Sequence, residues 1–260
     1  MKKYDIVGTA MTKQHKHYSN TNLFIRSLLY SILIVLSAMI DGTLCILALP
    51  FPLRVRYQIG QYWMSAMPKL GKVLCHMDYH IEGLEHIKKI KNGIIFSKHQ
   101  SAWETLFLGG IADQVVITVK KEFLWVPFFG WGLAALKPIA INRSKSRLAI
   151  QQLLQQGQYH LKKGRWVLIF PEGTRTAVGH TGKYRMGGAC LAAETGYPMI
   201  PVAHNAGRCW PRNQFLKRPG LIRVVIGPPI YPKGRTPEEL LKLAKNWIED
   251  TMKKIDSPSS

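Results

Sequence analysis

The stretch Ile95-Phe96-Ser97-Lys98-His99-Gln100-Ser101-Ala102-Trp103-Glu104 runs from an apolar segment through a polar turn into the start of a helical pattern. His99 precedes Glu104 by five residues, and a regular helix would rotate their side chains about 140° apart. We therefore place His99 in the turn after a strand at Gly93–Ser97, and Glu104 in the first turn of the next helix. This strand-turn-helix unit is typical of an α/β domain.

Two roles are open for Glu104. Its carboxylate is able to reach back to the His99 imidazole, which would give a base and an orienting acid that activate a hydroxyl for attack on an acyl carbonyl. Ser101 and Glu104 also fit a capping box, in which the carboxylate accepts a hydrogen bond from the Ser101 backbone N–H. The two roles are compatible because a carboxylate accepts several hydrogen bonds. For His99, the alternative to a base is an ordinary surface-loop histidine.

The alternation of apolar runs and helical patterns continues on both sides of this stretch. A helix is expected at Arg147–Lys163, ending in a cap at Gly164, and another after the capping box that starts at Thr236. The fold class is therefore α/β, a mostly parallel sheet flanked by helices over residues 73–256, with a flexible tail at 257–260. The expected strands are Tyr79–Glu82, Gly93–Ser97, Val115–Val119, Pro138–Asn142, Trp166–Phe170, Met199–Ala203 and Ile222–Ile226.

The apolar stretch Leu28–Leu53 is interrupted at Asp41-Gly42 and again by two prolines. Its first half is shorter than the ~20 residues that span a bilayer, and a span would hold Asp41 near its middle. Basic residues on both flanks favour the cytoplasmic side for both ends. These features predict a two-helix membrane-anchoring hairpin over residues 27–72 that bends at Asp41-Gly42, after a basic segment at 1–26. A single tilted span is the alternative.

The chain has 36 Lys and Arg against 15 Asp and Glu, a formal net charge of +21 over 260 residues. Such an excess attracts nucleic acid or an anionic membrane surface, unless it is merely a generic basic surface. No helix-turn-helix, RNA-binding or zinc-finger pattern is present, so we expect no nucleic-acid partner. We also expect no metal site, because His76 and His80 lack a nearby third ligand and the cysteines are scattered, at 45, 75, 190 and 209.

Two further segments carry groups suited to a phosphate. Asn142-Arg143 ends one expected strand, and Phe170-Pro171-Glu172-Gly173-Thr174-Arg175 follows another. The loops after parallel strands are where open α/β sheets bind ligands. Gly173 allows close backbone approach, Thr174 supplies a hydroxyl, and Arg143 and Arg175 supply planar forks for two hydrogen bonds. Lys183 and Arg185 are candidates for a second phosphate contact, or for ordinary solvated charges.

These blocks resemble, in order and spacing, the glycerolipid acyltransferase family, in particular its bacterial-type lysophosphatidate (1-acyl-sn-glycerol-3-phosphate) acyltransferases. The resemblance implies that His99 is the catalytic base with Glu104 as its orienting acid, although the family's usual acid is Asp. It implies that Arg143, Glu172, Gly173 and Arg175 bind the acceptor. To these residues we add Thr174 for its hydroxyl and Lys183 for its charge. The matching blocks are His99-x4-Glu104, Lys137–Arg143, Phe170–Arg175 and Met199-Ile200-Pro201-Val202, with Pro201 in a structural or acyl-side role.

The activity implied is transfer of a fatty acyl group from acyl-CoA or acyl-ACP to the sn-2 hydroxyl of lysophosphatidate, giving phosphatidate in phospholipid synthesis. The thioester is a co-substrate, and no other cofactor is expected. Acyl carrier protein and an anionic membrane surface are the expected partners, at the cytoplasmic face of a bacterial inner membrane. Two alternatives remain: another acceptor such as a lyso-ornithine lipid, or a non-enzymatic basic membrane-binding protein. A serine hydrolase is disfavoured, since no Gly-x-Ser-x-Gly elbow is present.

Overall fold

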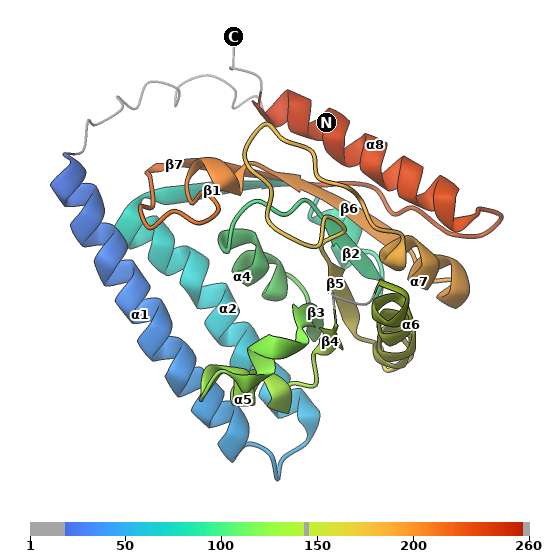
Figure 1. Cartoon of the computed structure of the whole chain (residues 1–260), viewed down its shortest axis with the longest axis horizontal. Helices are drawn as coiled ribbons and strands as arrows, with labels where there is room; N and C mark the ends of the chain where they lie inside the picture. The colour runs from blue at the N-terminus through green and yellow to red at the C-terminus, as the bar shows by residue number, and fades with distance from the viewer. Residues whose placement is uncertain (1–18, 143–145, 257–260) are drawn as a thin grey trace, which may run out of the picture.

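The computed structural model describes residues 19–142 and 146–256 (Figure 1). Arg143, most of the basic segment at 1–26 and the predicted tail at 257–260 therefore lie outside the described residues.

A seven-stranded sheet in the order β1-β7-β6-β2-β5-β3-β4 forms the centre of the molecule. All its strand pairs are parallel except β6 with β7, so the predicted mostly parallel α/β fold is confirmed. Each strand lies within two residues of its expected bounds. The strands are β1 Met77–Glu82, β2 Ile94–Ser97, β3 Val115–Lys120, β4 Ile139–Ile141, β5 Trp166–Ile169, β6 Met199–His204 and β7 Gly220–Ile226.

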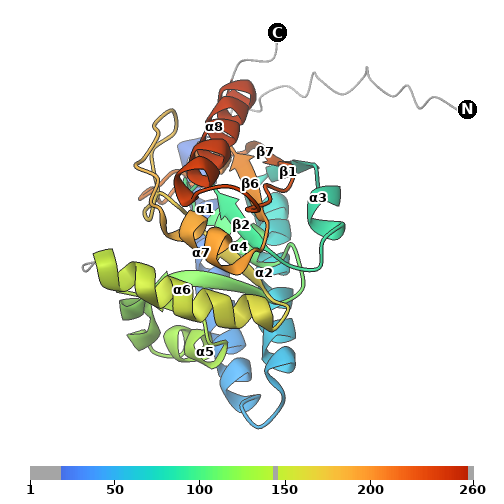
Figure 2. The ribbon, with the colours of Figure 1, turned by 90° about the vertical axis from the view of Figure 1, so that its right-hand side faces the viewer.

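Helices cover both faces of the sheet (Figure 2). Side chains alternate along β2, so Ile94 and Phe96 join one core cluster while Ile95 joins the other. The first cluster includes residues of α6, α7 and α8, and the second includes residues of α1, α2 and α4. The helices are α1 Asn20–Leu47, α2 Leu53–Cys75, α3 Glu85–Lys88, α4 Trp103–Gly109, α5 Phe129–Ala135, α6 Ser146–Lys162, α7 Gly187–Thr195 and α8 Pro237–Asp256, with 3-10 turns η1 Lys121–Trp125 and η2 Ala206–Arg208.

The predicted N-terminal pair of helices is present, but the predicted bend at Asp41-Gly42 is wrong. Helix α1 continues through these residues to Leu47, and the chain reverses at 48–52, where Pro50 and Pro52 lie, before α2 begins. Figure 1 shows α1 and α2 running side by side to this shared turn. Proline is the stronger helix terminator, because a glycine inside a helix costs only about 1 kcal/mol.

Gly42 has a packing role instead. A Cβ at this position would lie 2.5 Å from the backbone oxygen of Phe128, and one at Gly132 would lie 2.2 Å from the Gly42 Cα. The two glycines therefore let α1 and α5 approach each other closely. Gly42 therefore marks a helix-helix contact and not the predicted turn.

His160, near the end of α6, is buried, and its Nδ1 lies 3.2 Å from Nη1 of Arg165. Arg165 donates, so His160 is neutral. Burial and the charge of Arg165 lower the pKa of His160 from 6.5 to about 4. Because the unfolded chain then binds the extra proton first, folding loses stability as the pH falls from 6.5 toward 4.

We therefore expect the free energy of unfolding to fall in that window by on the order of 3 kcal/mol on account of His160, at about 1.4 kcal/mol per pKa unit. The check is denaturant unfolding in detergent micelles at several pH values, for the wild type and for His160→Gln. The difference between the two proteins should shrink steadily on acidification. A difference that does not depend on pH would contradict the assignment.

Candidate active site

The turn after β2 and the loop after β5 meet at one edge of the sheet. Strand β2 ends at Ser97 and β5, its parallel neighbour, ends at Ile169. The two strands run the same way, so the segments that follow them, 98–102 and 170–185, lie together. The predicted site residues of both segments are therefore brought to one place.

His99 and Glu104 form the predicted pair. Nδ1 of His99 lies 2.9 Å from Oε1 of Glu104, and the imidazole stacks on the Phe170 ring with centroids 4.0 Å apart. An ionised carboxylate only accepts, so Nδ1 carries the proton and Nε2 presents its lone pair. Among the described residues, Nε2 has no hydrogen-bond partner. The geometry is that of a base held in one tautomer by an acid behind it.

Glu104 also caps the helix, so both roles open to it are realised. Oε1 accepts hydrogen bonds from the backbone N–H groups of Gln100 and Ser101, at 2.9 and 2.8 Å. Burial alone would raise the pKa of Glu104, but the hydrogen bonds from the His99 ring and the Ser101 N–H hold it below its ordinary value. The carboxylate is therefore ionised at neutral pH.

His204 is a part of the site that the sequence analysis missed. It ends β6, is fully buried, and makes a 2.9 Å hydrogen bond from Nε2 to the backbone oxygen of Lys98. Its Nδ1 accepts from the Ala206 N–H, and burial lowers its pKa, so the ring is neutral. His204 thus supports the turn that carries His99 from beneath. The expected strand stopped at Ala203, one residue short of it.

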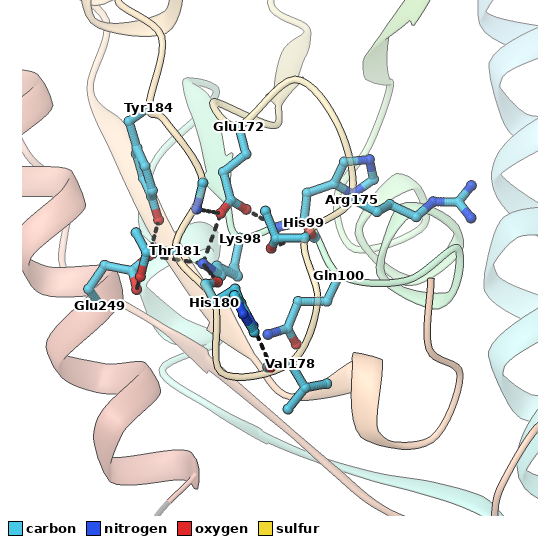
Figure 3. Close-up of polar contacts among 12 residues, drawn as sticks. Lys98, His99, Gln100, Glu172, Arg175, Val178, His180, Thr181, Tyr184 and Glu249 are labelled. Atoms are coloured by element: carbon cyan, nitrogen blue, oxygen red, sulfur yellow. Dashed lines mark hydrogen bonds and ion pairs between the residues drawn. The ribbon is translucent and has the colours of Figure 1, made fainter. Parts of the chain in front are cut away.

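Glu172 is placed differently from its predicted role in binding the acceptor. Its side chain is buried, and its carboxylate accepts from Lys98 Nζ at 2.8 Å, the His99 N–H at 3.0 Å and the Gly182 N–H at 2.9 Å (Figure 3). These donors occupy both oxygens. A buried anion would also repel a phosphate, so the geometry fits the positioning of the His99 turn better than contact with substrate.

Phe170 and Pro171 at the start of the Phe170–Arg175 block are buried, and its last three residues are more exposed. Gly173 has φ +69°, a left-handed conformation that glycine adopts without strain, and Thr174 is exposed. In Figure 3 the half-buried Arg175 extends away from the Glu172–Lys98 contact. Next to it, the Thr176 N–H and Oγ1 both donate to the His99 backbone oxygen, at 2.8 and 3.1 Å. The loop is thereby fastened to the turn that carries His99.

Three predicted residues remain, and each is placed differently. Lys183 is exposed on the same loop. Pro201 is buried in β6 opposite Phe96, and its backbone oxygen accepts from the Gly227 N–H, which fits the structural role. Arg143 lies outside the described residues, although the N–H of Asn142 beside it donates to Gln152 Oε1 at 2.9 Å.

The described residues contain no group of three or more His, Cys, Asp or Glu side chains arranged to hold a metal ion. The side chains of the site themselves offer proton transfer at His99 and a nearby positive charge at Arg175.

Comparison with known proteins agrees with this geometry. A family model described as acyltransferase matches residues 78–205. The chain is 47% identical to a Pseudomonas aeruginosa 1-acyl-sn-glycerol-3-phosphate acyltransferase, covering 89% of this chain and 91% of that one. It is 30% identical to the protein of that name from Saccharomyces cerevisiae, over 71% of this chain and 63% of that one.

The fold matches that of a solved structure, the 1-acyl-sn-glycerophosphate acyltransferase PlsC from Thermotoga maritima. The TM-score is 0.75 at 22% identity, over 92% of this chain and 98% of that one. Nearly the whole chain, including the N-terminal helix pair, thus takes part in a known architecture.

Proposed function

We propose, from the premise that this chain belongs to the acyltransferase family and is an enzyme of that class, that it forms phosphatidate. The acyl group would pass from an acyl thioester to the sn-2 hydroxyl of lysophosphatidate. The observation that carries the proposal is the His99–Glu104 pair, with Nε2 open beside the loop that holds Arg175. Because the chain belongs to a family of enzymes, the alternative of a non-enzymatic membrane-binding protein no longer applies.

In the proposed reaction, His99 Nε2 takes the proton of the acceptor hydroxyl as its oxygen attacks the thioester carbonyl. The new C–O ester bond forms, the C–S bond breaks, and the thiolate leaves with the proton that His99 returns. Glu104 holds the proton-bearing Nδ1 and stabilises the imidazolium while it exists. Glu172 contributes by fixing the backbone of the turn, through the His99 N–H.

We assign the acceptor phosphate to Arg175, with Lys183 and Arg143 as additional cations and Gly173 and Thr174 as the adjoining backbone and hydroxyl. Arg175→Ala is expected to raise KM for lysophosphatidate about 10–100-fold, the equivalent of a charge-assisted hydrogen bond of about 1.5–3 kcal/mol. KM for the acyl donor should not change. Steady-state kinetics in mixed micelles, with each substrate varied in turn, measures both.

Arg235→Ala is the matched control for this variant. Arg235 is an exposed arginine just before α8, and its Nη1 donates to the Tyr231 backbone oxygen. This substitution removes the same positive charge at a position away from the site. An acceptor KM that responds equally to both substitutions would mean that net charge, and not a phosphate contact, is being measured.

The acceptor and donor are tested together by one assay of the purified protein. Lysophosphatidate and a lyso-ornithine lipid are offered as acceptors, each with acyl-CoA and with acyl-ACP. We expect transfer to lysophosphatidate, and the ratio of rates with the two donors identifies the carrier. Transfer only to the lyso-ornithine lipid would leave the acyltransfer chemistry intact and replace the acceptor.

For location, we propose attachment to the cytoplasmic face of a bacterial inner membrane. Helix α1 is long and apolar enough to cross a membrane, and only 17% of its most apolar window is buried in the structure. Its exposed side chains include Ile25, Val35 and Ile40. An uncovered apolar surface of this kind, on a chain of charge +21, suits an anionic bilayer.

A further inference from the structure

Lys98, directly before the catalytic His99, is a buried ammonium with three acceptors. Its side chain is only 1% exposed, and Nζ donates to Glu172 Oε1 at 2.8 Å, the His180 backbone oxygen at 3.1 Å and Glu249 Oε1 at 3.0 Å (Figure 3). Burying a charge is unfavourable unless it is paired and hydrogen-bonded. The three acceptors match the three protons of the ammonium group.

Glu249 comes from α8, far along the chain from this turn, and it binds the loop as well as Lys98. Its Oε2 accepts from Thr181 Oγ1 at 2.6 Å, and its Oε1 accepts from the Tyr184 hydroxyl at 2.8 Å. Burial opposes its ionisation, but the hydrogen bonds from Thr181, Tyr184 and Lys98 lower the pKa of Glu249 below its ordinary value. One ionised carboxylate therefore joins the C-terminal helix, the catalytic turn and the 171–185 loop.

Arg212 Nη1 donates to the backbone oxygen of Arg175 at 2.6 Å, and the other contacts that fix the 171–185 loop form two sets. One set fastens it to its own base and to the turn: the Arg185 N–H donates to the Pro171 oxygen, and Thr176 donates to the His99 oxygen. The other set fixes residues 180–184, the far arm of the loop. The Gly182 N–H donates to Glu172, the His180 oxygen accepts from Lys98, and Thr181 and Tyr184 donate to Glu249. Between the two sets, residues 177–179 are exposed.

We propose that Glu249 is a positioning residue for the acceptor site. From α8, it holds the far arm of the 171–185 loop and the Lys98 side chain, and thereby sets where Arg175 lies relative to His99. The assignment of Arg175 to the acceptor rests on the proposed function; the fixing of the loop does not.

The attachment of α8 does not depend on this carboxylate. The helix packs through buried apolar side chains one or more turns apart, namely Leu240, Ala244, Ile248, Met252 and Ile255. Buried ionic clusters are also often no more stable than apolar residues of the same volume, which makes geometric placement a better reason for this one than stability.

The test compares Glu249→Gln with Asp250→Asn, two substitutions that each remove one negative charge from adjacent positions of α8. Asp250 is an exposed residue whose carboxylate pairs with Lys253, one turn along the same helix, at 2.9 Å. We expect Glu249→Gln to raise KM for lysophosphatidate about tenfold, since small displacements of substrate-holding groups have large effects. The change in kcat should be smaller, KM for the acyl donor should stay constant, and Asp250→Asn should match the wild type.

Hydrogen exchange of the 171–185 amides, measured by mass spectrometry without any substrate, gives a second readout. Exchange at the loop should become faster in Glu249→Gln, while α8 keeps its protection. Unchanged exchange at the loop would overturn the proposal. Faster exchange with an unchanged acceptor KM would show that the loop is held for another purpose, and would also overturn it. If the wild type does not use lysophosphatidate, the exchange result still stands, so the two failures are distinguishable.

If Glu249→Gln does not fold, Thr181→Val and Tyr184→Phe remove the donors that face this carboxylate. Each should shift acceptor KM and loop exchange in the same direction by a smaller factor. Because both donors act through one carboxylate, the double variant should fall short of the product of the two single effects. Independent effects would argue against a shared anchor.

Discussion

His99→Ala is expected to lower kcat by about 10²–10⁴-fold, the usual contribution of a positioned general base. His99 presents Nε2 for the acceptor proton, because Nδ1 is occupied by Glu104. Alanine leaves the Glu104 contacts with the Gln100 and Ser101 N–H groups in place. The measurement is the acyl transfer rate at saturating substrates.

His80→Ala serves as the control for this variant, because His80 is an exposed histidine on the edge strand β1. Thermal unfolding of His99→Ala should show only a modest loss of stability, from the lost stacking on Phe170. Folded His99→Ala that keeps most of its turnover would falsify the assignment of the base.

Glu104→Gln is expected to lower turnover per folded molecule by roughly 10²-fold, less than the about 10⁴-fold seen where a substitution also reverses the histidine tautomer. Three donors point at Oε1, so a glutamine should keep its carbonyl oxygen there and preserve the tautomer. The charge that stabilises the imidazolium is lost. Oε2 is buried without a partner among the described residues, so the new amide N–H₂ would also cost about 1–3 kcal/mol of stability.

Ser101→Ala separates this effect from helix capping. The Ser101 hydroxyl accepts from the Trp103 N–H at 3.2 Å, and its removal should cost about 1 kcal/mol of stability while the backbone bond to Glu104 remains. Unfolding in denaturant and kinetics per folded molecule are compared for both variants. Equal turnover in the two would mean that Glu104 is only a cap, despite its contact with His99.

The fold was largely predictable because its signals are local. Short apolar runs bounded by turns located all seven strands, and the capping box at Thr236 located the start of α8, where Thr236 and Glu239 bond each other's backbone N–H groups. The bend at Asp41-Gly42 was wrong because a glycine in a helix has two meanings, a break or a close contact. Only the partner helix α5 shows that the second applies.

The candidate site, like the fold, was predictable where its signals are local and not where they depend on distant parts of the chain. The five-residue spacing from His99 to Glu104, with a strand before and a helix after, was enough to place the pair and its capping. The inward turn of Glu172 was not predictable, because the sequence around it reads equally well as a phosphate loop. Its partner Lys98 lies 74 residues away, and Glu249, the other carboxylate that Lys98 binds, lies 151 residues from Lys98.

The sequence by itself determined the α/β architecture, the pairing of His99 with Glu104, and the family to which they point, because these depend on periodicity and on residues a few positions apart. Only the tertiary structure decided which charges face the substrate and which hold the site together. Glu172 and Glu249 are carboxylates on a strongly basic chain, and either would pass in sequence for a surface charge. Burial beside Lys98 makes them positioning groups, since an ammonium removed from water has to find its counter-charges in whatever parts of the chain the fold brings beside it.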